Sequence, residues 1–205
     1  MALNAANIRV GAARIYMGTT PPTAGQALNL DGSGVPPTGV EVGLTEGEAV
    51  FTYEVTYFEV PAEQSLAPVA VFATEESAQL EFTMKELVNA NIQDFLHTLV
   101  AVTTNAAPSE GSQSKDIFEG GRGSGEVTLQ SVTLVTPAYG PAPSNGVGTI
   151  RYQYVMLFRA YQSEAAALRF TKSGDQLMKC TYKAIADLTR ADTSTLFQVG
   201  VERYA

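Results

Sequence analysis

The stretch from residue 150 to 161 decides the fold class, and it reads Ile150-Arg-Tyr-Gln-Tyr-Val-Met-Leu-Phe-Arg-Ala-Tyr161. Apolar residues and tyrosines at every second position from Ile150 alternate with Arg151, Gln, Val, Leu and Arg159. Side chains point to alternate faces of a strand, so this pattern predicts a long strand with one apolar face. The other face is expected to be half polar and to carry the two arginines.

A similar alternation of aromatic residues occurs at 51–60. Phe51, Tyr53, Val55 and Tyr57 are expected on one face of a strand, opposite Thr52, Glu54 and Thr56. The short polar insert at 45–48 predicts a hairpin between strands at 40–44 and 49–60. Further strands are expected at 8–17, 69–74, 78–83, 127–135, 166–171, 176–188 and 196–201.

One helix is expected directly after the strand at 78–83. Thr83-Met-Lys-Glu86 fits a capping box, in which the threonine hydroxyl and the glutamate each accept a backbone amide of the first turn. Val88, Ile92, Phe95, Leu96 and Leu99 then recur at the spacing of one helix face. His97 lies opposite that face, so it is expected at the solvent or at a subunit interface.

About nine strands and one helix predict a mainly β chain, an antiparallel β-sandwich or open barrel with one α-helix packed on its side. The 205 residues suffice for a single domain covering 1–205. Stretches rich in Gly, Pro and Ser predict long loops at about 19–39, 105–126 and 136–148.

The sequence is poor in catalytic groups. One cysteine, Cys180, and one histidine, His97, leave too few ligands or bases for the common zinc and Ser-His chemistries. The glycine-rich run at 120–125 precedes an expected strand instead of a helix, so it does not fit a phosphate-binding loop. We therefore expect no enzyme activity, no cofactor and no metal. Without a leader-like start or a long apolar run, a soluble, unexported protein is expected.

Charge is distributed unevenly along the chain, whose net charge is -8. Residues 1–120 carry 15 acids and 4 bases, a balance of -11, whereas residues 121–205 carry 6 acids and 9 bases, a balance of +3. The acidic balance disfavours a protein that binds nucleic acid by neutralising phosphates. A solvated acidic face would also explain it. The alternative is an acidic surface that meets a basic face of another subunit or repels an anionic polymer.

Several segments resemble the major tail (tail tube) proteins of long-tailed bacteriophages with non-contractile tails. The segments, in chain order, are Gly11-Ala-Ala-Arg-Ile-Tyr-Met-Gly18, Val42-Gly-Leu-Thr-Glu-Gly-Glu-Ala-Val-Phe51, Leu80-Glu-Phe-Thr-Met-Lys-Glu-Leu87, Cys180-Thr-Tyr-Lys-Ala-Ile-Ala-Asp187 and Leu196-Phe-Gln-Val199. They span nearly the whole chain, but the stretches 105–126 and 136–148 match no pattern of the family.

The resemblance implies a structural virion protein whose hexameric rings stack head to tail into the tube that conducts the phage genome. It implies tape-measure and terminator proteins as further partners, assembly in the bacterial cytoplasm, and no membrane. Acidic side chains on the polar strand faces would keep DNA from sticking to the lumen, because binding requires basic residues that release counterions. Glu48, Glu54 and Glu81 are the lumen candidates, and Arg151, Arg159 and His97 are the candidates for the subunit interface.

Two other readings stay open. A capsid decoration or tail-terminator subunit would form a closed ring or trimer and never a filament. A carbohydrate-binding β-sandwich would be expected to expose a row of aromatic residues that includes Trp, and the chain has no Trp.

Overall fold

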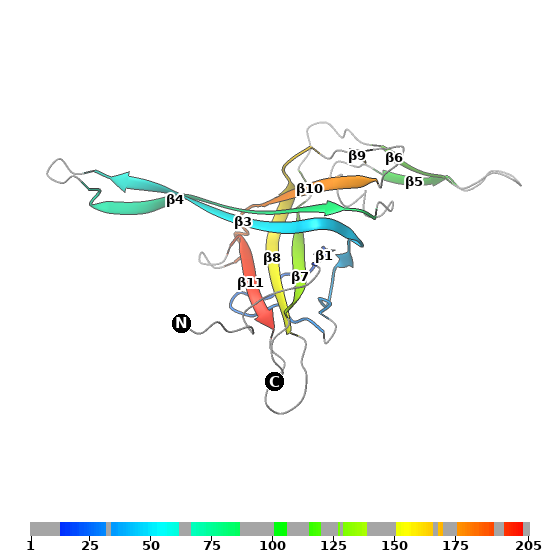
Figure 1. Ribbon diagram of the computed structural model, residues 1–205, viewed down its shortest axis with the longest axis horizontal. Coiled ribbons are helices and arrows are strands. Elements are labelled where there is room, and N and C mark those ends of the chain that lie inside the picture. The colour runs from blue at the N-terminus through cyan, green and yellow to red at the C-terminus, as the bar shows by residue number, and fades with distance from the viewer. Residues whose placement is uncertain are drawn as a thin grey trace, which may run out of the picture.

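The computed structural model describes residues 13–31, 34–61, 67–86, 101–105, 115–119, 127, 129–138, 151–165, 168–169, 176–190 and 195–202. Within these residues the chain is mainly β, and every strand pair is antiparallel (Figure 1). The strands are β1 (Arg14–Met17), β2 (Val40–Glu41), β3 (Thr45–Val60), β4 (Ala70–Met84), β5 (Ala101–Asn105), β6 (Lys115–Glu119), β7 (Gln130–Ala138), β8 (Arg151–Gln162), β9 (Leu168–Arg169), β10 (Leu177–Ala184) and β11 (Phe197–Glu202).

One nine-stranded sheet folds back on itself into two layers. Its order is β2-β1-β7-β8-β10-β4-β3, with β11 paired to β8 and β9 to β10, whereas β5 and β6 form a separate hairpin. We call β2, β1, β7, β8 and β11 the first layer, and β10, β4 and β3 the second layer. The two layers pack face to face, as the expected β-sandwich requires.

The main hydrophobic core lies between the two layers. The first layer contributes Ile15, Met17, Val132, Leu134, Val155 and Leu157, and the second contributes Ala78, Leu80, Phe82, Met84, Met178, Cys180, Tyr182 and Ala184. Within β4 the buried residues occupy every second position from Ala78 to Met84, which is the periodicity of a strand with one face in a core.

A second cluster covers the opposite face of the first layer. The loop over 19–39 supplies Leu28 and Leu30, which pack with Tyr16, Val135, Tyr152, Tyr154, Met156 and Phe158. The Leu28 N–H donates a hydrogen bond of 2.8 Å to the Tyr154 hydroxyl, which in turn donates to Gln198 Oε1 at 3.2 Å. The loop is therefore anchored to the sheet, and its described residues contain no strand, as expected.

Strand β8 is buried on both faces over its middle, which corrects the expectation of a half-polar face. Val155 and Leu157 face the main core, and Tyr154 and Met156 face the second cluster. The face that the sequence predicted as apolar is the one that the loop covers, and the face expected to be half polar is buried against the second layer, which alternation alone could not indicate. Arg159 is half-buried near the end of the strand.

The first expected hairpin is also wrong. Residues 45–48 are part of β3, and β3 pairs with β4, whereas β2 pairs with β1. The register shifts between Glu46 and Val50, where Gly47 has a φ of 77°, so a bulge absorbs the polar insert within one strand. The strands expected at 69–74 and 78–83 are one strand, β4, with a second irregularity opposite Thr56 and Tyr57.

The helix expected over residues 83–99 does not begin with the predicted capping box. Thr83 pairs with Glu46 as part of β4, and Glu86 uses its Oε2 to accept a hydrogen bond of 3.2 Å from the Leu44 N–H. No helix occurs in the residues that the structure describes, and residues 87–99 lie outside them.

Two expected loops contain strands. The segment expected as a loop at 105–126 includes β6, which pairs with β5, and the loop expected at 136–148 starts later because β7 continues to Ala138. Pro137 pairs with Tyr152 near the end of β7, where the missing N–H of a proline is tolerated. The prediction of loops at 105–126 and 136–148 relied on serine and proline content, which does not exclude the strand residues found there.

We expect Leu80→Ala to lower the free energy of unfolding by about 2–5 kcal/mol, because it leaves a cavity in the core between the layers. Leu80 is fully buried and pairs with Phe51 and Tyr182. Urea denaturation followed by circular dichroism measures the change. The exposed neighbour Thr52 provides the control, since Thr52→Ala is expected to change stability by less than about 0.5 kcal/mol. Equal effects of the two substitutions would contradict the assignment of the core.

Candidate functional site

The surface with the most candidate residues is the face of the second layer that points away from the core, here called the outer face. In β4 the residues between the buried positions Ala78, Leu80, Phe82 and Met84 face away from the core. Residues of β3 and β10 that pair with them lie on the same face of the sheet, and most of these residues are polar. The outer face comprises Glu46, Val50, Thr52, Glu54 and Thr56 of β3, Glu75, Ser77, Gln79, Glu81 and Thr83 of β4, and Lys179, Thr181 and Lys183 of β10.

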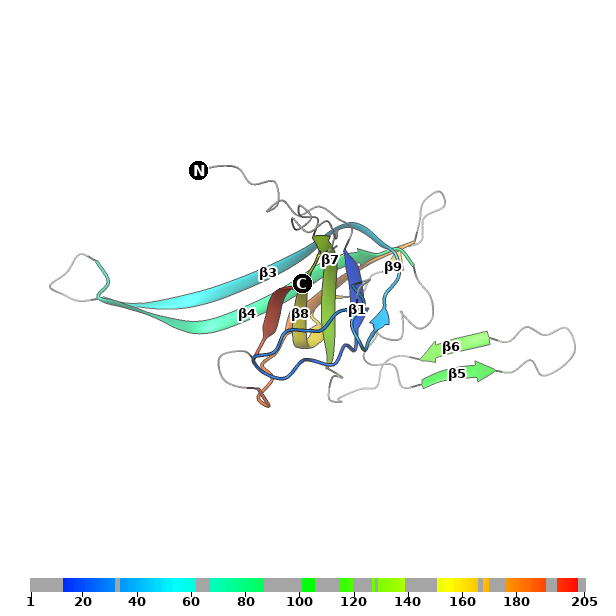
Figure 2. The ribbon, with the colours of Figure 1, turned by 90° about the horizontal axis from the view of Figure 1, so that it is seen from below.

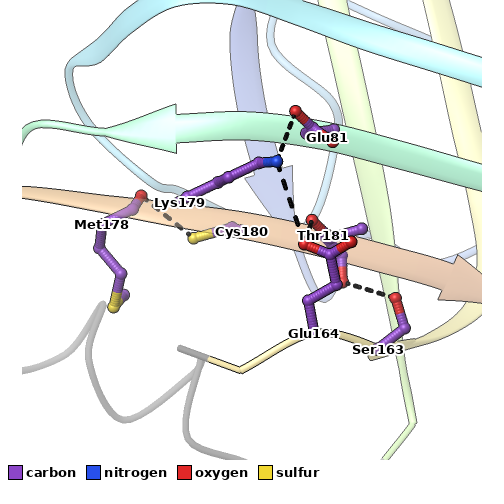
Figure 3. Close-up of polar contacts among 7 residues, drawn as sticks. All are labelled: Glu81, Ser163, Glu164, Met178, Lys179, Cys180 and Thr181. Atoms are coloured by element: carbon purple, nitrogen blue, oxygen red, sulfur yellow. Dashed lines mark hydrogen bonds and ion pairs between the residues drawn. The ribbon is translucent and has the colours of Figure 1, made fainter. Parts of the chain in front are cut away.

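A charged network lies in the centre of the outer face (Figure 3). Lys179 Nζ is 3.0 Å from Glu81 Oε1 and 4.0 Å from Glu164 Oε2, and the Thr181 hydroxyl donates a hydrogen bond of 3.1 Å to Glu164 Oε2. The hydrogen bond to Glu81 raises the pKa of Lys179. Because these side chains are about half exposed, solvent screens the ion pairs and they contribute little to stability.

Two of the three lumen candidates lie on this outer face. Glu54 pairs with Ser77 and is exposed, whereas Glu81 pairs with Val50 and is partly neutralised by Lys179. Glu48 is exposed and lies within the irregular stretch between Glu46 and Val50. Of the three, Glu54 and Glu81 therefore share one surface.

Acidic and basic residues are concentrated in different parts of the sequence, but the fold brings both kinds together in this network. Lys179 belongs to the basic part of the sequence, yet it pairs with Glu81 from the acidic part because β10 and β4 are neighbouring strands. The acidic excess is concentrated farther out. Residues 54–77 contain five glutamates and no lysine, arginine or histidine.

Four of them, Glu54, Glu59, Glu75 and Glu76, belong to a projecting hairpin, called the arm, formed by residues 54–60 of β3 and 70–77 of β4, whereas Glu63 lies outside the described residues. Figures 1 and 2 show the arm extending well beyond the body, where it has the thickness of a two-stranded ribbon. Its exposed large side chains are Tyr57, Phe58, Val71 and Phe72. Sequence reasoning missed the arm, because the adjacent apolar residues Tyr57 and Phe58 favour burial on both faces of a strand, whereas both are exposed.

The interface candidates are spread over the molecule. Arg159 helps lower the pKa of Asp187, after the larger effect of the hydrogen bond from Thr189, so it acts on a loop of its own subunit. Arg151 begins β8 and pairs with Ala138, but its side chain lies outside the described residues, as does all of His97.

A groove of about 390 Å³ lies between residues 25–27 of the anchored loop and strand β11. Tyr154, Phe158 and Phe197 contribute aromatic surface to it, and the guanidinium carbon of Arg190 lies 3.8 Å from the centre of the Phe158 ring. Arg190 Nη1 donates a hydrogen bond of 2.6 Å to the Pro22 carbonyl. These contacts tie the loop to the first layer, so we interpret the groove as structural.

No group of three or more His, Cys, Asp or Glu side chains that could hold a metal ion occurs in the described part of the chain. Cys180 is buried in the main core, and burial raises the pKa of its thiol to about 12. A thiol with that pKa is protonated and unreactive at neutral pH.

No protein-family model matches the sequence, and no curated protein matches it. Among the described residues no helix is long and apolar enough to cross a membrane.

We expect Asp187→Asn to lower the free energy of unfolding by about 0.5–1.5 kcal/mol at pH 7, because it removes the negative charge that strengthens the two hydrogen bonds that Oδ1 accepts from Thr189. Its pKa is lowered in the folded state. The carboxylate therefore stabilises the fold above about pH 4, the ordinary pKa of aspartate, and this contribution disappears as pH falls through the folded pKa. Urea denaturation between pH 3 and 7 should show the two proteins converging in acid. A constant difference would contradict this role. Glu48→Gln is the control for an exposed carboxylate.

Proposed function

We propose that this chain is a structural subunit that assembles with copies of itself, and specifically a tail tube protein of a long-tailed phage with a non-contractile tail. In this proposal hexameric rings stack head to tail into a hollow tube through which the genome passes. The tail tube fold and a single α-helix within residues 87–99 on the side of the sheet are parts of the same proposal.

The arm is the observation that carries self-assembly. A two-stranded hairpin is at best marginally stable in water, and the arm exposes aromatic and β-branched side chains along both strands. Phe58 and Phe72 are cross-strand partners on one face of the arm and are 57% and 59% exposed, and such contiguous apolar surface is unusual on a monomer. A partner protein that covers the arm would remove this surface from water.

The β-sandwich supports the tail tube proposal together with the sequence segments that resemble the family. The described strands supply the antiparallel layers that such a subunit needs. The arm and the β1–β2 edge are different surfaces of the subunit. Ring closure and stacking both use contacts between unlike surfaces. Non-enzymatic function is part of the proposal and agrees with the poverty of catalytic groups in the sequence.

We assign the outer face to the lumen, with Glu54 and Glu81 on that face and Glu48 in the bulge of the same strand as the candidate residues for the lining. Carboxylates repel phosphates, and DNA binding requires cations that displace its counterions. Lys179 is held by Glu81 and Glu164, so its charge is balanced locally. Tape-measure and terminator proteins are the further partners, and the mature location is the virion tail after assembly in the bacterial cytoplasm.

Negative-stain electron microscopy of the purified protein over a range of concentrations tests the proposal. Rings with a central hole, or tubes built from them, are the expected result. A protein that stays monomeric at the highest concentration would refute self-assembly. Closed rings that never stack under any condition would instead favour a tail-terminator or capsid decoration subunit.

Charge reversal tests the lumen. Glu54→Lys changes the charge of each subunit from negative to positive at an exposed position of the outer face. Assembled variant tubes are expected to retain fluorescent double-stranded DNA in a sedimentation assay, and added salt should release it. Wild-type tubes should retain none.

The control is Asn29→Lys, which adds a positive charge at an exposed residue of the anchored loop, away from the outer face. Tubes of the control variant should behave as the wild type does. Equal DNA retention by the two variants, or none by Glu54→Lys, would exclude the outer face from the lumen.

A further inference from the structure

The two layers of the sandwich diverge on the side where the arm leaves the body. Phe197, Val199 and Val201 of β11 share a face with the core residues of β8, since Phe197 pairs with Leu157 and Val199 with Val155. Phe51, Tyr53, Val55 and Tyr57 of β3 lie on the core-facing side of the second layer, in register with Leu80, Ala78, Glu76 and Ala73. Both sets of side chains therefore continue the inner surfaces of the sandwich.

Phe197 is the last residue that fills the space between these surfaces. Its ring centre lies 5.0 Å from those of both Phe51 and Tyr53. Beyond it, Val199 is 48% exposed and Tyr57 is 62% exposed, although both lie on core-facing sides. We call the exposed apolar surface formed by Tyr53 and Tyr57 of β3 and by Val199 and Val201 of β11 the wedge. Figure 1 shows β11 descending from the root of the arm.

The wedge is apolar at its centre and acidic along the arm. Glu76 pairs with Val55 and Glu59 with Val71, so both carboxylates lie on the core-facing side of the arm, and residues 54–77 hold no basic residue. An occupant that buried the valines and tyrosines would remove apolar surface from water, and it would gain if it carried a cation beside its apolar residues.

The opposite end of the same molecule has these properties. On the far side of the body from β11, at the edge formed by β1 and β2, Val40 is 58% exposed and Leu44 is 67% exposed (Figure 1). Arg14 of β1 has a half-exposed side chain whose Nε is 3.8 Å from Glu41 Oε1, a distance beyond that of a hydrogen bond. Arg14 interacts with Tyr16 and Glu41, which raise its pKa, so it keeps a positive charge at the same β1–β2 edge as the exposed Val40.

We infer that the wedge receives the β1–β2 edge of a second copy of this chain, with Val40 and Leu44 packed against the valines and tyrosines. This inference rests on the proposed self-assembly and names the surfaces that carry it. The two surfaces are different, so each copy can bind one neighbour at each side, and the contact propagates from copy to copy until a ring closes.

Cross-linking of cysteines tests this contact. Val40→Cys and Val199→Cys in one chain place a thiol at each of the two surfaces, while the native Cys180 is buried and protonated. Mild oxidation should produce a ladder of dimers, trimers and higher species on a non-reducing gel, and a reductant should abolish it. Each single variant can form no species larger than a disulfide-linked dimer. Adding Tyr57→Ser to the double variant should weaken the ladder severalfold, because it removes part of the wedge.

The matched control pairs Val40→Cys with Thr52→Cys, whose second thiol lies on the outer face of the same layer as the arm. Both substituted positions are exposed, and unchanged thermal unfolding by circular dichroism checks that the variants fold. A ladder no stronger than the control, in a preparation that electron microscopy shows as rings or tubes, would overturn the inference and leave the proposed function standing. A wild-type protein that never associates would overturn both.

Discussion

The divided pairing of β8 is the constraint on which the rest of the structure depends. One edge of β8 pairs with β7 along nearly its whole length, but the other edge pairs with β11 over residues 152–157 and with β10 over residues 160–162. A strand can have only one neighbour on an edge at each position, so β10 and β11 separate where the pairing changes. This separation turns a single sheet into two layers, and it opens the angle beside Phe197.

The positions of the strands could be predicted from the sequence where local alternation decides the structure. The pairing of one strand with another could not be predicted. Residues 150–161 were recognised because one face alternates strictly, yet burial of Val155 and Leu157 depends on a layer far away in sequence. The choice of β4 as partner of β3 depends likewise on a bulge at Gly47, since a polar insert of this length is typical of both a turn and a bulge. Thr83 fits both a capping residue and a strand residue, and pairing with Glu46 and Lys179 decided in favour of the strand.

Predictions about the candidate surfaces were limited in the same way. Alternation correctly put Glu54 on the polar side of its strand, and register then brought Glu81 onto the same face. The partnership of Glu81 with Lys179 could not be predicted, because it joins residues from distant segments through strand pairing. The exposure of Tyr57 was missed for a related reason: an apolar residue in a strand is expected in a core, and only the three-dimensional structure shows that this part of the strand extends past it.

The order in which these strands appear during synthesis has a consequence for the arm. The contacts between β3 and β4 join segments that are close in sequence. In contrast, β1 pairs with β7 and β4 pairs with β10, so the two layers can form only after these later strands have been synthesised. Topologies dominated by such distant pairings fold slowly, and partly folded chains with exposed apolar strands tend to aggregate. The arm is therefore synthesised long before the body that carries it is complete. Its four glutamates would oppose association of nascent chains during that interval, because like charges repel.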